Sequence, residues 1–319
     1  MNSDRSGIDI RTGARLHFGL LDTMAPFGGV GLMIDRPQTF VRVEPGERFA
    51  VRTPAVSEQL DRGQSDRDKA DVEQRVLSVT RRFCQQFAAD FPELPAVTCT
   101  VFQRPAAHTG LGTGTQLALA IASGLCQHLK PTFATKRIIQ TVAGRGARSG
   151  VGNEGFFSGG MIVDTPPVRA IDFPGEWTMV LLQPQVALEP VAGLEESQRF
   201  SQLPVPAESH RRSLMEGLQR LVSAVEQQNF AEFSEAVYEY NHRSGELFKA
   251  SQGGAYNGAE VTRLITQLRE MGIQGVGQSS WGPTVFACFP TRSDAETFCQ
   301  FPPAASSTAT LVSAQAIRH

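Results

Sequence analysis

The stretch H-T-G-L-G-T-G-T-Q at positions 108–116 decides which fold this chain of 319 residues is expected to adopt. It joins an alternating segment at 97–103, which predicts a strand, to an apolar run at 117–129, which predicts a helix. Its three glycines let the backbone turn tightly and approach a ligand without a Cβ clash. A helix that starts after such a loop presents free N–H groups and a positive dipole end, which attract phosphate. The alternative is a plain glycine-rich turn capped by Thr115, and the motif alone leaves both interpretations open.

The composition is that of a globular protein large enough for about two domains. Apolar residues make up 41% and charged residues 19% of the chain, so a sizeable core is feasible. A net charge of −2 provides no field that would favour nucleic acid, and no apolar run approaches the roughly 20 residues of a membrane span. The polar N-terminus does not resemble a secretory signal. We therefore expect a cytoplasmic enzyme or binding protein that contacts neither nucleic acid nor membrane.

The pattern of elements along the chain predicts an α+β fold. Strands are expected at 8–18, 39–52, 97–103, 159–164, 179–182, 285–289 and near Thr310, and helices at 72–87, 117–129, 136–142, 214–225, 230–240, 261–268 and 293–299. The polar segment 52–71 is expected to be a loop, and 302–307 a shorter one. Five cysteines without a C-x-x-C pair predict buried free thiols. The first half is rich in strands and the second in helices, with a change in composition near residue 190.

Alternation along the first strand places Arg15, His17 and Gly19 on one face, opposite Leu16 and Phe18. A face that carries an arginine and a histidine can line a polar site. A solvated face with a hydrogen-bonded histidine is the alternative, and the strand alone favours it.

Two further glycine-rich stretches are candidates for ligand binding. The first, 144–153, carries Arg145 and Arg148, and arginine binds phosphate oxygens in a bidentate manner. The second, 275–283, could offer a close backbone approach, amide and hydroxyl groups and an aromatic face. Its candidate residues are Gly277, Gln278, Ser279, Ser280 and Trp281. Solvated arginines in the first stretch and a tryptophan buried for packing in the second are the alternatives.

Four other polar residues carry a weaker signal. His128 and His242 fall on predicted helices, where structural or solvated histidines are common. Asp164 and Asp172 end or follow strands, so either could cap a backbone group or bind a metal ion. The sequence identifies no metal ligands beyond these possibilities.

Together these loops resemble the GHMP kinase superfamily, whose central loop usually has the pattern G-L-G-S-S and which implies a two-domain α+β fold. Thr113 and Gly114 stand where those kinases have the two serines, which argues against ATP-dependent phosphorylation. The chain is more similar to one branch, the β-ribofuranosylaminobenzene 5′-phosphate (β-RFAP) synthase family. The shared motifs, in order, are R-L-H-F-G-L-L-D (15–22), G-L-G-[ST]-G-T-Q-L-A-L-A (110–120), G-R-G-x-R-S (144–149), G-G-x-I-V-D (159–164) and G-Q-S-S-W-G-P (277–283).

This resemblance implies a reaction in tetrahydromethanopterin synthesis. Phosphoribosyl pyrophosphate would condense with 4-aminobenzoate or 4-hydroxybenzoate, releasing pyrophosphate and carbon dioxide. The donor loop would comprise His108, Gly110, Leu111, Gly112, Thr113, Gly114, Thr115 and Gln116, and the catalytic residues would be Arg15, His17 and Asp22. The resemblance also implies Mg²⁺ with the pyrophosphate, a homodimer, and GHMP-like domains at 1–190 and 191–319. The alternatives are a GHMP-type small-molecule kinase that uses ATP, and a non-catalytic binding relative.

Overall fold

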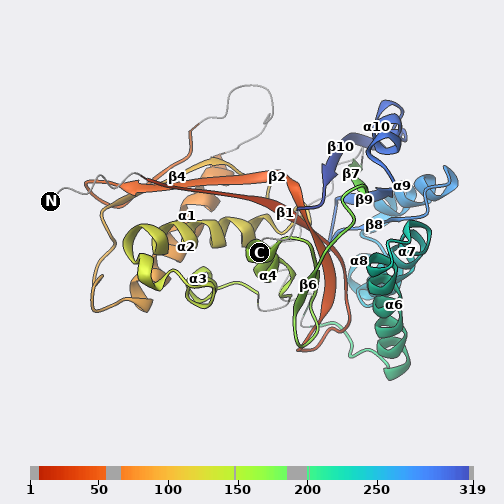
Figure 1. The fold of residues 1–319 in the computed structure, drawn as a ribbon, viewed down its shortest axis with the longest axis horizontal. Helices are drawn as coiled ribbons and strands as arrows, with labels where there is room; N and C mark the ends of the chain where they lie inside the picture. Colours follow the sequence, from red (N-terminus) through yellow and green to blue (C-terminus); the bar gives the residue numbers. More distant parts are fainter. Residues whose placement is uncertain (1–6, 55–65, 147–148, 185–199, 201, 316–319) are drawn as a thin grey trace. The chain divides into compact units, whose positions relative to one another are not determined.

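The computed structural model describes residues 7–54, 66–146, 149–184, 200 and 202–315 (Figure 1). The chain divides into two compact units, each assembled from stretches that are separated in the sequence. Unit 1 comprises Met1–Ala14, Pro37–Ala107 and Thr113–Gly146, and unit 2 comprises Arg15–Arg36, His108–Gly112 and Ala147–His319. The predicted domain boundary at residues 190 and 191 lies outside the described residues. No helix in the described part of the chain is long and apolar enough to cross a membrane.

Unit 1 is a layer of strands covered by helices. Its strands are β3 (Ala50–Arg52), β4 (Val97–Gln103), and parts of β1 (Ile8–Leu20) and β2 (Gly29–Pro45); its helices are α1 (Asp66–Gln86), α2 (Thr113–Leu129), α3 (Lys136–Ala143) and the short η1 (Pro131–Phe133). β3 pairs parallel with β4, and β4 pairs antiparallel with β2. Figure 1 shows α1 and α2 running along one face of these strands. A Cβ at Gly124 would lie 2.6 Å from Val43 Cγ2, so the glycine lets α2 pack directly on the strands.

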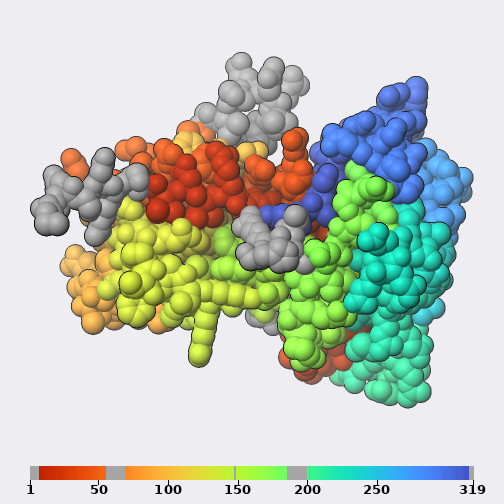
Figure 2. Space-filling view, in the orientation of Figure 1, coloured from red at the N-terminus to blue at the C-terminus, as the bar shows by residue number. Residues whose placement is uncertain are grey.

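Unit 2 contains a four-stranded antiparallel sheet in the order β10-β7-β9-β8. These strands are β7 (Thr178–Pro184), β8 (Val276–Gln278), β9 (Val285–Phe289) and β10 (Ser306–Ser313); the helices are α4 (Val151–Ser158), α6 (Glu208–Glu226), α7 (Phe230–Glu246), α8 (Lys249–Gln252), α9 (Gly258–Glu270) and α10 (Arg292–Gln300). Apolar side chains of α9, including Leu264 and Leu268, form a core with Val180 and Val285 of the sheet. In Figure 2 the paired helices α6 and α7 form the teal surface of this unit.

Unit 2 also contains a smaller strand ladder that supports the candidate site. The first part of β2 pairs antiparallel with β5 (Met161–Val163), and β5 pairs with β6 (Arg169–Ile171). The helix α4 precedes β5 in the chain and contacts it. This arrangement places the end of β5 beside the beginning of α4.

Most predicted elements are confirmed. The single strand predicted at 39–52 is wrong, because β2 begins at Gly29 and ends at Pro45, and a separate strand β3 begins at Ala50. The predicted bounds of β4 and β9 match the structure. The helix predicted from 117 begins at Thr113, α1 begins inside the predicted loop 52–71, and β8 lies inside the predicted loop 275–283. The helix α4 was missed because glycines at 152 and 155 obscure its apolar pattern. All five cysteines are free, but only Cys99, Cys126 and Cys288 are buried, while Cys84 and Cys299 are half-buried.

Candidate functional site

The strand β1 is held in register by side chains of α7, which donate hydrogen bonds to three consecutive carbonyls. Tyr240 Oη donates to Gly19 (3.1 Å), Asn241 Nδ2 to Phe18 (2.7 Å) and Ser244 Oγ to Leu20 (2.9 Å). A Cβ at Gly19, which has a φ of +154°, would lie 2.5 Å from Ser244 Cβ. The glycine of the opening motif therefore permits the close approach of α7 to β1.

Asn241 also connects β1 to β8. Its Nδ2 donates to the Gln278 carbonyl (2.9 Å), and the Gln278 N–H donates to its Oδ1 (2.9 Å). A fully bonded, buried amide of this kind fixes the two strands relative to each other. The opening motif and the C-terminal glycine-rich loop are therefore brought together by a residue that sequence analysis did not identify.

His17 lies at the centre of this part of unit 2 and is only 3% exposed. Its backbone N–H donates to Ser279 Oγ (3.0 Å), and its carbonyl accepts from the Ser280 N–H (3.2 Å). Its ring Nε2 lies 3.0 Å from Ser149 Oγ. Burial, with a smaller contribution from the charge of Arg15, lowers the pKa of His17 well below 6.5, so the ring is uncharged at neutral pH. The interpretation of this strand face as solvated is therefore wrong for His17.

Arg15 lies on the same strand and contacts the glycine loop. Its N–H donates to the Leu111 carbonyl (3.0 Å), and its Nη1 donates to the Gly110 carbonyl (3.2 Å). Ser279 Oγ donates to the same Gly110 carbonyl (2.8 Å). We call Arg15, His17, Gly110, Ser149 and Ser279 the His17 cluster. It unites residues from four of the predicted motifs within unit 2.

The first two glycines of the loop are required by contacts within the protein. Gly110 and Gly112 have φ values of +81° and +68°, which favour glycine. A Cβ at Gly110 would lie 2.2 Å from the Ser279 carbonyl oxygen, and one at Gly112 would lie 2.6 Å from Arg15 Cγ. The described structure therefore explains both glycines without a ligand.

The second half of the loop belongs to unit 1, where Thr113, Gly114, Thr115 and Gln116 form the first turn of α2. The first N–H groups of a helix have no intrahelical acceptor, so this turn presents donors. The Gln116 side chain, by contrast, is fully buried, and its Oε1 accepts from Thr12 Oγ1 (2.8 Å). This side chain therefore fastens α2 to β1 inside unit 1.

Arginines gather at the first turn of α2. A Cβ placed on Gly114 would lie 2.9 Å from Arg75 Nη1 and 3.6 Å from Arg145 Nη2. Arg75 Nε pairs with Asp71 Oδ2 (2.7 Å), and the buried Arg104 lies with its Nη1 3.6 Å from the same oxygen. We call Gly114, Arg75, Arg104, Arg145 and Asp71 the Gly114 cluster. Arginines beside the first N–H groups of a helix, which have no intrahelical acceptor, are suited to bind phosphate oxygens.

The remaining predicted site residues are placed as follows. Asp22 Oδ2 pairs with Arg211 Nε (2.7 Å), and Asp22 Oδ1 accepts from the Met24 N–H (2.9 Å). Both contacts of Asp22 are therefore structural. His108 is half-buried with a φ of +62°. Trp281 is half-buried and meets Phe248 edge-on, with ring centroids 5.1 Å apart. Arg148 lies outside the described residues. Gly277 cannot carry a side chain, because its Cβ would lie 2.4 Å from Asn241 Oδ1.

Asp164 contacts the beginning of α4. Its Oδ2 accepts from the Gly150 N–H (2.6 Å), and its carboxylate also interacts with the Ser149 hydroxyl. Burial raises the pKa of Asp164, and the bonds from Gly150 and Ser149 oppose that rise. Of the two interpretations of Asp164, capping of a backbone group is therefore confirmed.

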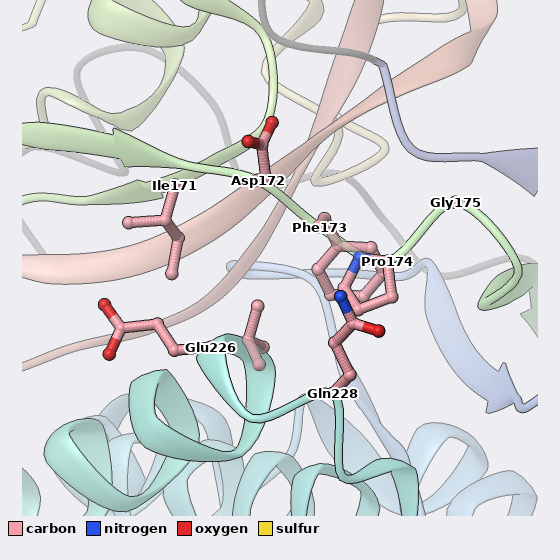
Figure 3. A pocket seen from close by; sticks show the side chains of 8 residues that line it. Ile171, Asp172, Phe173, Pro174, Gly175, Glu226 and Gln228 are labelled. Carbon is pink, nitrogen blue, oxygen red and sulfur yellow. The ribbon is translucent and has the colours of Figure 1, made fainter.

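A hollow of about 390 Å³ lies elsewhere in unit 2, between the segment after β6 and the end of α6 (Figure 3). Asp172 and Phe173 line one side, and Glu226 and Gln228 line the other. The Glu226 carboxylate is paired with Arg169 (3.0 Å). None of the residues predicted for the glycine loops lines this hollow, so we do not assign the site to it.

No group of three or more His, Cys, Asp and Glu side chains in the described residues is placed to hold a metal ion. Magnesium often binds through substrate phosphates, waters and only one or two carboxylates. The Gly114 cluster suits the phosphate part of such a complex, since its arginines and helix N–H groups are donors to oxygen.

Comparisons with known proteins identify relatives over most of the chain. Residues 221–304 match the family GHMP kinases C terminal. Beta-ribofuranosylphenol 5′-phosphate synthase from Methanothermobacter thermautotrophicus is 28% identical over 304 residues, which cover 87% of each chain. The protein of the same name from Archaeoglobus fulgidus is 27% identical over 305 residues, which cover 87% of this chain and 86% of the relative.

Solved structures of low sequence identity share the fold. Mevalonate pyrophosphate decarboxylase from Streptococcus pyogenes is 12% identical, with a TM-score of 0.70 over 98% of each chain. Mevalonate kinase from L. major is 13% identical, with a TM-score of 0.67 over 97% of this chain and 96% of that one. These structures confirm the α+β, GHMP kinase-like fold predicted from the glycine loops.

Proposed function

We propose that the chain is a member of the β-RFAP synthase family of the GHMP kinase superfamily and that it acts as a decarboxylating phosphoribosyltransferase. The donor is phosphoribosyl pyrophosphate and the acceptor is 4-hydroxybenzoate or 4-aminobenzoate. The names of the three matched relatives contain phenol, which favours 4-hydroxybenzoate. The similarity to these relatives over 87% of the chain is the observation that carries the proposal.

The reaction forms one carbon–carbon bond and breaks two bonds. The bond between ribosyl C1 and pyrophosphate breaks and leaves a cationic carbon, which the ring carbon that bears the carboxylate attacks. The bond from that ring carbon to the carboxylate then breaks, and its electron pair restores the aromatic ring. The products are a C-riboside 5′-phosphate, pyrophosphate and carbon dioxide. The protein's contribution is positioning and charge stabilisation.

The Gly114 cluster is suited to the leaving pyrophosphate. Its arginines and the first N–H groups of α2 donate hydrogen bonds to phosphate oxygens, and their positive charge stabilises the charge that develops on departure. Mg²⁺ would enter with the pyrophosphate, whose oxygens would supply several of its ligands. It would offset the negative charge of the phosphates.

The His17 cluster is suited to the benzoate. Arg15 would pair with the carboxylate before it leaves, and the uncharged ring of His17 would orient the arene or the ribose by a hydrogen bond. The buried surroundings of His17 exclude water, which would otherwise compete for the cationic ribosyl carbon. The homodimer expected from the resemblance also remains part of this proposal.

The competing function is a GHMP-type kinase that uses ATP, which the shared fold alone would allow. Parallel incubations with γ-labelled ATP and with pyrophosphate-labelled phosphoribosyl pyrophosphate separate the two. We expect labelled pyrophosphate only from the ribosyl donor, in a reaction that requires the benzoate. Transfer of the γ-phosphate to a small molecule, with the ribosyl donor left intact, would show a kinase. Donor binding without turnover would show a non-catalytic relative.

A further inference from the structure

The hydroxyl of Ser149 lies between three polar groups of unit 2. The Val151 N–H donates to its Oγ (3.3 Å), His17 Nε2 lies 3.0 Å from it, and the hydroxyl interacts with the carboxylate of Asp164, whose Oδ2 lies 2.6 Å from the N–H of the next residue, Gly150. A serine hydroxyl has one proton to donate and two lone pairs that accept. The three neighbours therefore use its whole capacity, and their chemistry fixes the direction of each bond.

The direction follows from the two neighbours whose roles are known. A backbone N–H can only donate, so Val151 occupies one lone pair of Ser149. A carboxylate accepts, and Asp164 already accepts the Gly150 N–H at 2.6 Å, so the Ser149 proton points to Asp164. The remaining lone pair of Ser149 faces His17, and a hydrogen bond there requires that Nε2 carry the hydrogen.

We propose that Ser149 and Asp164 are positioning residues that hold His17 as the neutral Nε2–H tautomer, so that Nδ1 accepts a hydrogen bond from a hydroxyl or amino group of the substrate. Within the described residues, the ring is hydrogen-bonded through Nε2 and not through Nδ1. The role toward substrate rests on the proposed function, in which two groups offer such a donor. One is the para O–H or N–H of the benzoate, and the other is a ribose hydroxyl.

The alternative arrangement assigns the opposite role to Ser149. If its proton pointed to His17, Nε2 would accept, and the ring would carry its hydrogen on Nδ1. His17 would then donate to the substrate rather than accept from it. The two arrangements differ in which ring nitrogen is protonated, and nitrogen NMR measures this directly.

The test uses the full chain labelled with ¹⁵N-histidine at neutral pH. The protein has six histidines, so His17→Gln identifies the His17 resonances by their loss. We expect a protonated Nε2 and an unprotonated Nδ1 in the wild-type protein. Ser149→Ala should lose this preference and Ser149→Thr should keep it. Ser158→Ala, at the far end of α4, should leave it unchanged because the Ser158 hydroxyl donates to the Glu154 carbonyl.

Asp164→Asn should change which ring nitrogen of His17 is protonated. It also provides a test if Ser149→Ala does not fold. The amide oxygen can still accept from the Gly150 N–H, while the amide nitrogen donates to Ser149. The Ser149 proton must then point to His17, so we expect the protonated nitrogen to change from Nε2 to Nδ1. A residue that only packs α4 against β5 would not produce this inversion. A wild-type ring protonated on Nδ1, or an Nε2–H ring in a folded Asp164→Asn, would overturn the tautomer assignment.

The ligand part is tested by adding 4-hydroxybenzoate alone and ribose 5-phosphate alone. We expect one of them to shift the wild-type Nδ1 resonance in the direction of an accepted hydrogen bond, and this identifies the donor. The shift should be absent in Asp164→Asn. If neither compound moves the resonance, the acceptor role is contradicted. The tautomer measurement needs no turnover, so its result stays interpretable even if the protein does not consume phosphoribosyl pyrophosphate.

Discussion

The His17 cluster and the Gly114 cluster differ in the charge of their central side chains. Around His17, hydrogen bonds to Ser149, Ser279 and Ser280 surround a buried and uncharged ring. Around Gly114, arginines gather at the first turn of a helix. An uncharged histidine held by serine hydroxyls, with one arginine nearby, suits an aromatic carboxylate, and a group of arginines suits phosphate. The difference therefore separates two parts of the proposed reaction, and mutations in each cluster should affect different kinetic constants.

The largest expected effect is on kcat after His17→Gln. The substitution would remove the hydrogen bond that we propose orients the substrate, and positioned proton-accepting groups typically contribute about 10²–10⁴-fold. We expect kcat to fall about 100-fold, measured as pyrophosphate release at saturating substrates. His242→Gln on α7 is the matched control and should retain wild-type kcat. A folded His17→Gln with unchanged kcat would remove His17 from the reaction.

The next largest effect is on the donor KM after loss of a Gly114-cluster arginine. A charge-assisted contact is worth about 1.5–3 kcal/mol. Arg145→Ala and Arg75→Ala should each raise the KM for phosphoribosyl pyrophosphate about ten-fold or more, since 1.4 kcal/mol corresponds to a factor of ten. The KM for benzoate should change little. The exposed Arg36→Ala serves as the control. Wild-type kinetics in both variants would mean that these arginines do not bind phosphate.

Arg15→Ala separates the two ligands because Arg15 is the charged member of the His17 cluster. We expect the KM for benzoate to rise several-fold, by loss of a contact of about 1.5 kcal/mol with the carboxylate. The donor KM should rise less. Initial rates measured with each substrate varied in turn give both constants. A variant that weakened only the donor would assign Arg15 to phosphate binding.

Gly114→Ala should slightly raise the stability of the protein and slightly weaken the binding of the donor. Alanine in place of a helical glycine stabilises a helix by up to about 1 kcal/mol. The added Cβ would lie 2.9 Å from Arg75 Nη1, so the end of that flexible side chain must move. We expect a slightly higher melting temperature together with a donor KM raised a few-fold. Gly112→Val is a poorer test, because it displaces Arg15 and strains a φ of +68°. An unchanged donor KM in Gly114→Ala would show that the position of Arg75 is unimportant.

The smallest effect is the pH dependence of stability that His17 causes. Because its pKa in the folded protein lies well below 6.5, the unfolded chain binds more protons as the pH falls through about 6.5. Stability should therefore fall on acidification below that pH, by at most about 1.4 kcal/mol per pH unit. Denaturant unfolding at a series of pH values measures the slope, which His17→Gln should reduce. An equal slope in both proteins would contradict a buried, neutral His17.

The fold was predictable where apolar residues follow a clear period. The strands β4 and β9 alternate or run apolar between polar ends, and their bounds were predicted to the residue. The start of α2 was not, because Thr113 to Gln116 lack apolar side chains. Gln116 is nevertheless buried, since its amide bonds Thr12 on β1. Such a contact depends on the fold and leaves no local pattern.

The site was predictable as a set of motifs and not as a set of contacts. The R-L-H opening, the glycine loop and the C-terminal loop were identified, and the structure joins them at His17, Gly110 and Ser279. The contacts that orient these residues join positions far apart in the sequence. Ser149 is 132 positions from its partner His17, and Asp164 is 14 positions from its partner Gly150. Arg75 lies in the middle of α1 and Arg104 follows β4. Both were missed because nothing in the local sequence indicates that Arg75 lies beside Gly114 or that Arg104 lies beside Asp71.

Counting the carbon dioxide and the pyrophosphate that are released would decide whether the protein is a decarboxylating phosphoribosyltransferase. The wild-type protein would be incubated with phosphoribosyl pyrophosphate and carboxyl-labelled 4-hydroxybenzoate or 4-aminobenzoate, and both products would be counted. Our account predicts equimolar carbon dioxide and pyrophosphate with at least one benzoate, and neither product when the benzoate or the donor is omitted. Pyrophosphate without carbon dioxide, or no consumption of the ribosyl donor with either benzoate, would contradict it.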